Sequence, residues 1–516
     1  MNSQNTDVIL LTSDKLNIKQ IVLFSKKKIK FTVSERSIEK VKLAREVIER
    51  IVENKIPSYG ITTGVGSQKD YIVERSVMND FQHQLLTAHS TVMTNSYVPD
   101  QVVRASLLIQ LNLFCSGTSG ISIETFNKLI ARLQDDNLPL SVDNCSVGAS
   151  DIVSLSQMSL NLFNKSIPLP NGQELQVPKL RDSDKLENVV EPQPFKLQPK
   201  EGLSLMNSNS LTLAQGVLLL YEIQGFLKAL DLVAAFSLEG FRANLTSINQ
   251  NVYQIHNQAG QVQSANNINS LLSFSKLWSI QEEARFVQDP LSFRCITQIH
   301  GAAYSSYDWC SGIYEKEVNL PVDNPLVSLE DQNVYSHGNM ENTLLALSMD
   351  TLRSALCKCI RTSGERIHKL HWPQFSGLST GLSQGNGMAS GGVQFLNLSH
   401  LASSSISHCG YLSNPTLNQY QGQLADGVED VAGMAPLSIS CTKKLLDDGW
   451  KVLTIELIIA IWAINYRNIP VTSIGFGLRS LHNLVLPLLP IGKEGEKVFD
   501  TRPIESILRD YISDNQ

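Results

Sequence analysis

The sequence predicts a mostly α-helical protein, because apolar residues recur at helical spacing over long stretches and strand-like runs are few and short. The longest predicted helices cover residues 33–54, 203–236, 342–370 and 450–466. The composition changes little along the 516 residues. This favours one large helical body decorated by loops. Within it we expect an N-terminal domain at residues 1–200, then a central helical bundle and a C-terminal helical region at 201–516.

The N-terminal part is expected to combine small strands with helices. Short strands are predicted at 20–24 and 29–33. The first clear helix follows at 33–54, with Ser34 as its N-terminal cap. Its apolar side chains lie at helical spacing: Ile38, Val41, Ala44, Val47, Ile48, Ile51 and Val52.

Helices and irregular segments alternate in the rest of the chain. These are a helical stretch at 79–133 broken at 116–120, an irregular surface excursion at 164–200, and short helices at 275–286 and 503–512. The most apolar stretch, residues 452–464, is interrupted by Glu456 and is too short to span a bilayer. We therefore predict that it is a buried core helix and that the protein has no membrane partner.

Composition and charge exclude several classes of partner. The formal net charge is -6 and the pI about 6.0, which does not suggest the clustered basic face that binds nucleic acid. No secretory signal is visible, so the eight cysteines are expected to be reduced thiols in a cytoplasm. Cys357 and Cys359, two residues apart on a predicted helix, point to different faces. Packed thiols are expected there, and no metal site.

Five polar segments without periodicity interrupt the helices, and loops held by a rigid scaffold are where functional sites usually lie. They are residues 59–66, 143–151, 207–210, 288–301 and 319–342. The first carries three glycines, two threonines and Tyr59, which makes it a flexible loop with one aromatic hydroxyl. We expect these loops to bind a small-molecule substrate.

Together these segments resemble the aromatic amino acid ammonia-lyases and aminomutases. The matching segments are YGITTGVG at 59–66, CSVGASD at 145–151, PKEGLSLMN at 199–207, QDPLSFRC at 288–295, NLPVDNP at 319–325, SHGNM at 336–340 and EDVAGM at 429–434. They occur in the family's order along nearly the whole chain. The resemblance implies a bundle of long antiparallel helices of the histidine and phenylalanine ammonia-lyase type. It also implies a homotetramer in which three subunits build each active site.

The family's electrophile is a methylidene-imidazolone ring, which it forms from its own Ala-Ser-Gly when the glycine nitrogen attacks the alanine carbonyl and two waters leave. Here the triad reads Ala149-Ser150-Asp151. Either the glycine is replaced or it is deleted, and deletion fits better because Leu155 then also falls in register. The attacking nitrogen belongs in both cases to a residue with a side chain, whereas the tight bend favours glycine. We predict that no ring forms and that the protein carries no other cofactor.

Two further departures agree with loss of the electrophile. The family's tyrosine in the QDxYS segment is Leu291 here, and leucine cannot transfer a proton. The family's phenylalanine beneath the ring is Met340, which can fill the same apolar space.

Other family residues are retained. Tyr59 matches the catalytic loop tyrosine, and a base role would require its pKa to fall from about 10. Arg294 matches the residue that grips the substrate carboxylate, with a structural ion pair to Asp289 as the alternative. Asn207 and Asn319 match asparagines near the electrophile and the substrate, although buried asparagines often only satisfy backbone groups.

Four residues bear on the side-chain pocket. His89 aligns with the selectivity pair and Glu429 with a glutamate typical of histidine enzymes, which together favour a polar or cationic substrate. A hydrogen-bonded core histidine is the alternative for His89. His337 replaces a family glycine and, with Glu341, is a candidate for acid–base chemistry.

Three functions remain open at this level. The chain is a true lyase or aminomutase, or an enzyme of specialised biosynthesis that catalyses a diverged elimination, cyclisation or condensation without the electrophile, or a non-catalytic binding subunit. The retained Tyr59, Arg294 and Glu429 argue against the last, and the triad favours the second.

Overall fold

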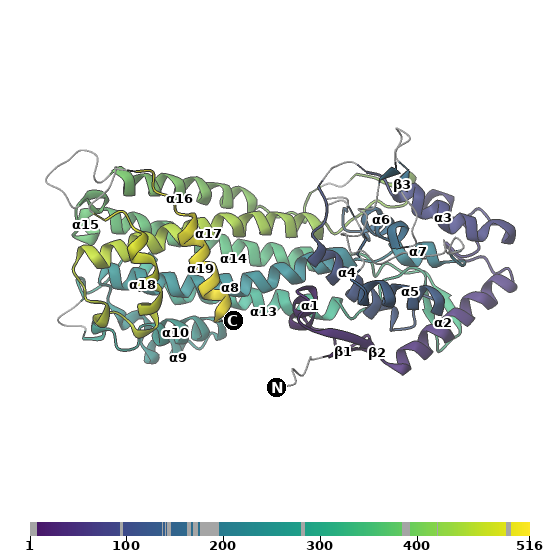
Figure 1. Ribbon diagram of the computed structural model, residues 1–516, viewed down its shortest axis with the longest axis horizontal. Helices are drawn as coiled ribbons and strands as arrows, with labels where there is room; N and C mark the ends of the chain where they lie inside the picture. Colours follow the sequence, from purple (N-terminus) through teal and green to yellow (C-terminus); the bar gives the residue numbers. More distant parts are fainter. Residues whose placement is uncertain are drawn as a thin grey trace, which may run out of the picture. The chain divides into compact units, whose positions relative to one another are not determined.

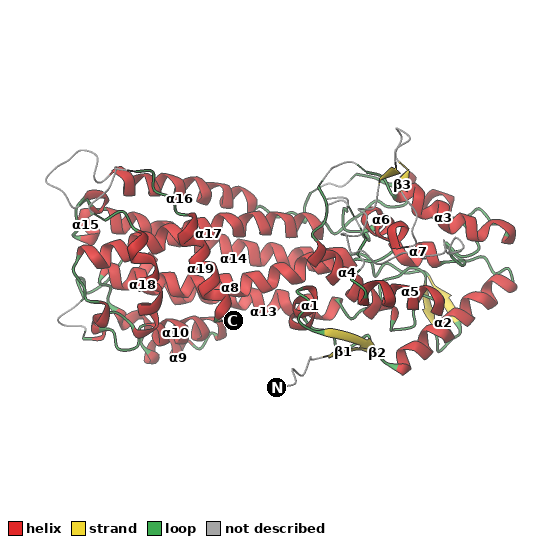
Figure 2. Cartoon of the chain, in the orientation of Figure 1, coloured by secondary structure: helices red, strands yellow, loops and turns green. Residues whose placement is uncertain are grey.

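The chain is mostly helical, as the sequence predicts (Figure 2). A computed structural model describes residues 8–92, 96–136, 138–139, 141, 146–162, 167–168, 174–175, 196–279, 284–383, 393–419, 422–491 and 497–515. Most of the predicted excursion at 164–200 and the first residue of the CSVGASD segment, Cys145, lie outside these ranges.

Two compact units make up the fold. The first comprises Met1–Tyr221, Ser311–Leu347 and Thr416–Ile439, and the second comprises Glu222–Cys310, Ser348–Pro415 and Ser440–Gln516. The predicted N-terminal domain falls within the first unit, and its boundary at residue 200 stays a prediction.

The elements of the first unit are mainly short (Figure 1). They are β1 (Val8–Leu11), α1 (Ile18–Ser25), β2 (Lys30–Val33), α2 (Glu35–Glu53), α3 (Met78–His89), α4 (Asp100–Phe114), α5 (Ile123–Gln134), α6 (Ile152–Leu162), β3 (Ile167–Pro168), β4 (Glu174–Leu175), α7 (Glu201–Met206), β5 (Leu326–Ser328) and β6 (Asn333–Tyr335).

Four long helices have residues in both units, and the others belong to the second. The long ones are α8 (Ser210–Phe241), α13 (Ile296–Glu317), α14 (Thr343–His371) and α17 (Ala435–Tyr466). The second unit adds α9 (Gln250–His256), α10 (Ala259–Leu271), α12 (Leu291–Arg294), α15 (Pro373–Ser376), α16 (Val393–Leu412), α18 (Arg479–Val485) and α19 (Arg502–Asp514).

Small strands near the N-terminus are confirmed, but only one lies where the sequence predicts it. β2 matches the predicted strand at 29–33 and pairs in parallel with β1. The predicted strand at 20–24 is wrong, because these residues lie in α1. Asn17 and Gln20 form a reciprocal capping box at its start, which satisfies backbone donors that a strand would have paired elsewhere.

The first predicted helix is confirmed as α2. Ser34 caps it by accepting a hydrogen bond from the backbone N–H of Ser37. The apolar face that the sequence indicates is buried, and Ala44, Val47 and Ile48 are fully inaccessible in a core that includes Ile61 and Val327. This core holds the beginning of the 59–66 loop against the first unit.

Other sequence predictions need correction. The helical stretch at 79–133 is divided into α3, α4 and α5, and the helix at 203–236 is two helices, α7 and α8, broken at 207–209. The predicted helix at 275–286 is wrong in the described residues, which contain only a single 3-10 turn, η4 (Lys276–Trp278), capped by Ser275. Sequence periodicity missed α10, α13 and α16, in which many polar residues interrupt the apolar pattern.

Long helices of the second unit lie side by side with consecutive helices antiparallel. Asp231 of α8 contacts His300 and Tyr304 of α13. Cys310 of α13 contacts Ser348 near the start of α14, and Ile299 near the start of α13 contacts Cys359 further along α14, so the two helices are antiparallel. Likewise, His408 pairs with Asp448 and Phe395 stacks on Trp462, so α16 and α17 are antiparallel. The predicted antiparallel bundle is confirmed.

The apolar stretch at 452–464 is a core helix, as predicted. It lies in α17, which is long and apolar enough to cross a membrane, yet 83% of its most apolar window is buried inside the protein. Glu456, the one charged residue in the stretch, forms an ion pair with Arg366 of α14, and both side chains are fully buried. Ser237 of α8 donates a further hydrogen bond of 2.6 Å to the same carboxylate.

We predict that Glu456→Ala lowers the free energy of unfolding by about 3–5 kcal/mol, because it leaves the Arg366 guanidinium buried without a counter-charge. Equilibrium unfolding in urea measures the change. Glu365→Ala is the matched control, since the Glu365–Lys369 pair is exposed at the glutamate and contributes at most about 1 kcal/mol. Equal losses in both variants would contradict this account.

Candidate active site

Tyr59 lies at the start of a tight loop that is held by its own hydrogen bonds. The backbone N–H of Ser58 donates to Thr62 Oγ1 at 2.8 Å, and the N–H of Gly66 donates to Tyr59 Oη at 3.0 Å. Gly60 adopts a φ of +64°, and a Cβ there would come within 2.3 Å of Leu203 Cδ2. Glycine is therefore required for the loop to pack on α7, and the half-buried tyrosine ring is positioned accurately.

The Tyr59 phenol lies within the electrostatic field of Glu429. Burial raises the pKa of Tyr59 above its ordinary value, and the negative charge of Glu429 raises it further, whereas the Gly66 N–H opposes the shift. Glu429 itself is half-buried, and its backbone pairs with Leu424 through two hydrogen bonds. Two predicted site residues, Tyr59 and Glu429, thus lie close enough in the first unit for the charge of Glu429 to act on the phenol.

The Ala149-Ser150-Asp151 loop is sharply bent. Gly148 has a φ of +93° and Ser150 a φ of +67°, which is the left-handed region that a residue with a side chain rarely adopts. Ser150 is held there by two asparagines: its Oγ donates to Asn207 Oδ1 at 2.7 Å, and its N–H donates to Asn209 Oδ1 at 3.1 Å.

Asp151 is committed to the protein framework at both its backbone and its side chain. Its N–H donates to Ser208 O at 2.8 Å. Its carboxylate, 1% exposed, accepts hydrogen bonds from Thr212 N at 2.8 Å and Thr212 Oγ1 at 2.6 Å. Burial raises the pKa of this carboxyl, and the bonds from Thr212 oppose that shift. Asp151 therefore anchors the first turn of α8, where the helix dipole favours a negative group.

The contacts of Asp151 disfavour the formation of a methylidene-imidazolone. Its formation requires the Asp151 nitrogen to reach the carbonyl carbon of Ala149, yet that N–H points to Ser208 O. The Asp151 side chain is anchored in α8, and Ala149 is bridged to Glu341. Closing the ring would remove the hydrogen bond from the Asp151 N–H to Ser208 O, and a buried acceptor left unsatisfied costs roughly 1–3 kcal/mol.

Glu341 of the 319–342 segment forms a backbone bridge with Ala149, and His337 lies earlier in the same segment. The polar atoms of both side chains already have hydrogen-bond partners. His337 Nε2 lies 2.8 Å from Asp323 O, and Nδ1 accepts the Asn339 N–H at 3.0 Å. Glu341 accepts hydrogen bonds from Thr343 N and Oγ1 at the start of α14. Met340 is half-buried, and its carbonyl accepts a bond of 2.8 Å from Asn209. Of these three, only the Met340 side chain is left for apolar contact with a ligand.

Asn319 has no described contact with the triad loop. Its Oδ1 accepts hydrogen bonds from Leu16 N and Asn112 Nδ2, both at 3.0 Å. Its Nδ2 donates to the carbonyls of Leu16 and Glu315, both at 2.8 Å. These four bonds tie the N-terminal segment to the end of α13, so the structure gives Asn319 the backbone-satisfying role that the sequence left open.

His89 and Arg294 have no contact with the triad loop among the described interactions. His89 lies at the end of α3, where Nδ1 is 2.7 Å from Leu85 O. Arg294 belongs to the second unit, at the end of α12. Its Nε is buried without a hydrogen-bond partner among the described residues. The alternative ion pair with Asp289 is not among the described ion pairs. The charge of Arg294 nevertheless acts on Asp289, whose pKa is raised by burial and lowered in part by the Asn244 N–H, Arg285 and Arg294.

Sequence reasoning missed a buried ion pair and two asparagines. Lys200, fully buried with a φ of +75°, donates to Asp323 Oδ2 at 2.6 Å. Burial lowers the pKa of the Lys200 ammonium, and Asp323 opposes that shift. The sequence also gave no reason to single out Asn209, which accepts the Ser150 N–H. Asn342, 3% exposed, has neither amide atom hydrogen-bonded in the described structure and lies between Gly148 and Gly433.

Residues 16–485 match the aromatic amino acid lyase family, and the chain belongs to that family. The resemblance of the loop motifs is thereby confirmed.

Individual relatives cover nearly the whole chain. A histidine ammonia-lyase of Alkaliphilus oremlandii is 31% identical over 459 residues, which are 89% of this chain and 88% of the relative. The ergothioneine-degrading ergothionase of Treponema denticola, solved with desmethyl-ergothioneine sulfonic acid, superposes with a TM-score of 0.87 at 26% identity, covering 98% and 99% of the two chains. Histidine ammonia-lyase from Trypanosoma cruzi has the same fold, with a TM-score of 0.82 at 23% identity over 99% and 94%.

We predict that Gly433→Ala destabilises the protein by about 1–3 kcal/mol through overpacking. A Cβ at this position would lie 2.2 Å from Asn342 Oδ1 and would push it toward the triad loop. Gly338→Ala is the matched control in the same unit, because nothing lies within 4 Å of its Cβ position. Thermal unfolding compares the two, and a control that loses as much as Gly433→Ala would refute the packing argument.

Proposed function

We propose that this protein is a carbon–nitrogen lyase that works without the methylidene-imidazolone and eliminates an amine from a cationic, histidine-derived substrate. The proposal rests on the hydrogen bonds of Asp151. Its backbone N–H donates to Ser208 O, and its carboxylate accepts from Thr212 N and Oγ1. A lyase without the electrophile must act on a substrate whose carbon–nitrogen bond breaks more readily than that of an ordinary amino acid.

The field around Tyr59 favours a cationic substrate. A tyrosine acts as a base only as the phenolate, yet burial and Glu429 both raise the pKa of Tyr59. A positive charge on the bound substrate, near Tyr59 and Glu429, opposes both effects and favours the phenolate. The substrate thus supplies the charge that the described residues around Tyr59 do not.

The same positive charge supplies the leaving group. When the α-nitrogen is quaternary, it departs as a neutral amine and needs neither protonation nor an electrophile. Tyr59 takes the β-proton, the electrons of that C–H bond form the double bond to the α-carbon, and the carbon–nitrogen bond breaks. The ergothioneine named for the ergothionase is such a histidine-derived betaine. The similarity of the ergothionase to this chain supports a histidine-derived betaine as the substrate.

Arg294 is proposed to hold the substrate carboxylate. Its Nε is buried and has no hydrogen-bond acceptor among the described residues, and a carboxylate matches the geometry of the guanidinium group. His89 and Glu429 are proposed to contact the azole ring, with Asn207 and Met340 near the reacting carbons. We further propose a cytoplasmic homotetramer, as the resemblance implies. Exposed apolar side chains on long helices, such as Leu344, Leu347 and Leu401, support such an assembly.

The absence of the ring is tested by intact mass. We expect the mass that the sequence encodes, with no near-ultraviolet absorbance beyond the aromatic side chains and no reaction with borohydride. A mass lower by two water molecules would overturn the proposal. It would favour the second candidate, a true histidine ammonia-lyase, which the relative of 31% identity supports.

The substrate class and the base are tested by turnover. We expect the trimethylated betaine of histidine to release trimethylamine and an acrylate, measured by its ultraviolet absorbance, whereas histidine is not deaminated. Tyr59→Phe should reduce the rate roughly 10²–10⁴-fold through loss of the base. Tyr97→Phe, an exposed tyrosine of the same unit, serves as the control.

Two results would count against the proposal. Turnover of histidine at a rate comparable to the betaine would place the enzyme with the ordinary deaminases. Betaine binding or turnover that neither Tyr59→Phe nor Arg294→Ala changes would show that the site is idle and would favour a non-catalytic binding subunit.

A further inference from the structure

Ser150 holds a strained backbone conformation in a buried place. Its φ of +67° lies in the left-handed region, which glycine adopts freely and residues with a side chain rarely adopt. Such strain persists only where the surrounding contacts enforce it, and strained residues cluster at functional sites. The contacts of the Ser150 side chain therefore bear on its function.

The amide of Asn207 can meet Ser150 in only one orientation. Its Nδ2 donates to Asn324 O at 2.9 Å and lies 3.5 Å from Asp323 Oδ1. Both of these neighbours are acceptors, so the NH2 group of the amide faces them and the carbonyl Oδ1 faces Ser150. Because this Oδ1 carries no proton, the Ser150 hydroxyl, 2.7 Å away, is the donor of the hydrogen bond between the two side chains.

The Ser150 hydroxyl is therefore left as an acceptor. Its single proton is used in the bond to Asn207, and Oγ keeps only its lone pairs. The other described hydrogen bonds of Ser150 use its backbone N–H and C=O, so no described group donates to Oγ. This oxygen can accept a hydrogen bond or contact a positive charge, but it has no proton to offer to a ligand.

A buried ion pair lies behind Asn207. Lys200 Nζ donates to Asp323 Oδ2 at 2.6 Å, and the lysine supplies the counter-charge that a buried carboxylate needs. Asp323 Oδ1 is close enough to Asn207 Nδ2 for the carboxylate charge to act on the amide. Hydrogen bonds that follow one another in the same direction polarise one another. The series from the Ser150 hydroxyl through Asn207 to Asp323 thus increases the electron density on Ser150 Oγ.

We propose that Ser150 Oγ contacts the positively charged nitrogen group of the substrate, and that Lys200 and Asp323 are positioning residues that act on Ser150 through Asn207. This inference rests on the proposed function, from which it takes the cationic substrate. The methyl groups of a quaternary ammonium carry its positive charge and contact acceptor oxygens through their C–H bonds. A substrate carboxylate, in contrast, gains nothing from an oxygen that cannot donate a proton.

The test compares two ligands of the same shape in the Tyr59→Phe protein, where turnover is slow. One is the trimethylated betaine of histidine, and the other has a neutral tert-butyl group in place of the trimethylammonium group. Calorimetry gives the dissociation constant of each ligand, and the ratio of the two constants measures the preference for positive charge.

Ser150→Gly should reduce this preference roughly 10–100-fold, as for the loss of a hydrogen bond to a charged group. Glycine adopts the left-handed conformation without strain, so the variant is expected to fold, and a thermal unfolding curve checks this. Binding of the neutral ligand should change little. An unchanged preference in a folded Ser150→Gly protein would overturn the role of Ser150.

A double-mutant cycle tests the positioning role. Asp323→Asn should reduce the preference by a smaller factor, because the amide keeps an oxygen for Lys200 but loses the charge that polarises Asn207. In the Ser150→Gly background, Asp323→Asn should reduce the preference no further. Additive effects of the two substitutions would show that Asp323 does not act through Ser150 and would overturn its assignment.

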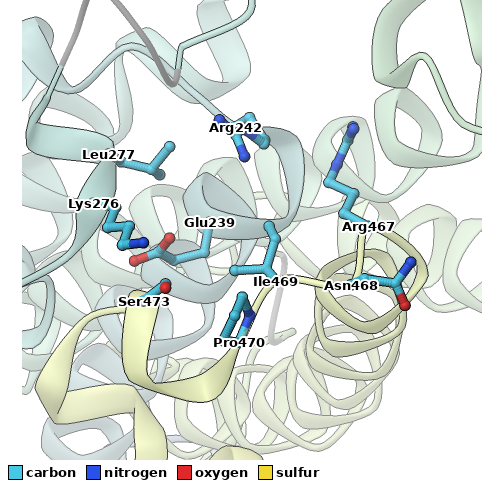
Figure 3. Close-up of a pocket in the computed structure, with 9 residues that line it drawn as sticks. All are labelled: Glu239, Arg242, Lys276, Leu277, Arg467, Asn468, Ile469, Pro470 and Ser473. Atoms are coloured by element: carbon cyan, nitrogen blue, oxygen red, sulfur yellow. The ribbon is translucent and has the colours of Figure 1, made fainter.

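Glu239→Gln is the matched control, because it also replaces a buried carboxyl group by an amide. Glu239 is 2% exposed and lines a pocket of the second unit together with Lys276 and Ser473 (Figure 3). Glutamine keeps an oxygen for the Gly475 N–H, which Glu239 accepts at 2.8 Å. The preference for positive charge should be unchanged in this variant. A reduction as large as that in Asp323→Asn would refute the specific role of Asp323.

Failure of this inference and failure of the proposed function give different results. If the betaine is bound and turned over but Ser150→Gly keeps the preference, the elimination stands and the role of Ser150 is refuted. If the betaine does not bind, the proposed function and the substrate contact of Ser150 both fall. Hydrogen exchange then decides the positioning role: the peptide that contains Ser150 should exchange faster in Asp323→Asn than in Glu239→Gln, and equal rates would overturn that role as well.

Discussion

The candidate active site depends on one buried carboxylate at the start of a long helix. Asp151 bonds to the first turn of α8 through Thr212, and its backbone N–H bonds to Ser208. A charged group that is buried this completely persists only when its oxygens are hydrogen-bonded. This anchoring fixes the bent triad loop and presents Ser150 to Asn207. The residue that would have to move to build an electrophile is therefore held by both its backbone and its side chain.

The electrostatics of the two units differ in kind. Around Tyr59, burial and the negative charge of Glu429 raise the pKa of the phenol. In the second unit, burial lowers the pKa values of Arg467 and Arg285, and the charge of Arg242 lowers both further, while Asp289 opposes the shift of Arg285. Buried charges elsewhere are matched within the protein, as in Arg366 with Glu456.

Several residues changed role once their contacts were known. Asn319 and Asn207 both lie in family motifs. The amide of Asn319 donates to the carbonyls of Leu16 and Glu315. Asn207 instead accepts a hydrogen bond from Ser150. His337 looked available for chemistry, yet both ring nitrogens are bonded. Leu16 is 303 residues from Asn319 in the chain, so local sequence patterns could not have predicted this hydrogen bond.

The sequence by itself determined the helical class, the apolar face of α2, the core character of α17 and the loops that carry the motifs. These follow from local periodicity and composition. Only the tertiary structure decided that residues 20–24 form a helix, that Asp151 anchors α8 and that Glu456 finds Arg366 inside the bundle. The physical reason is that hydrogen bonds and ion pairs form between groups that folding brings together. A side chain's chemistry is therefore fixed by neighbours that lie elsewhere in the sequence.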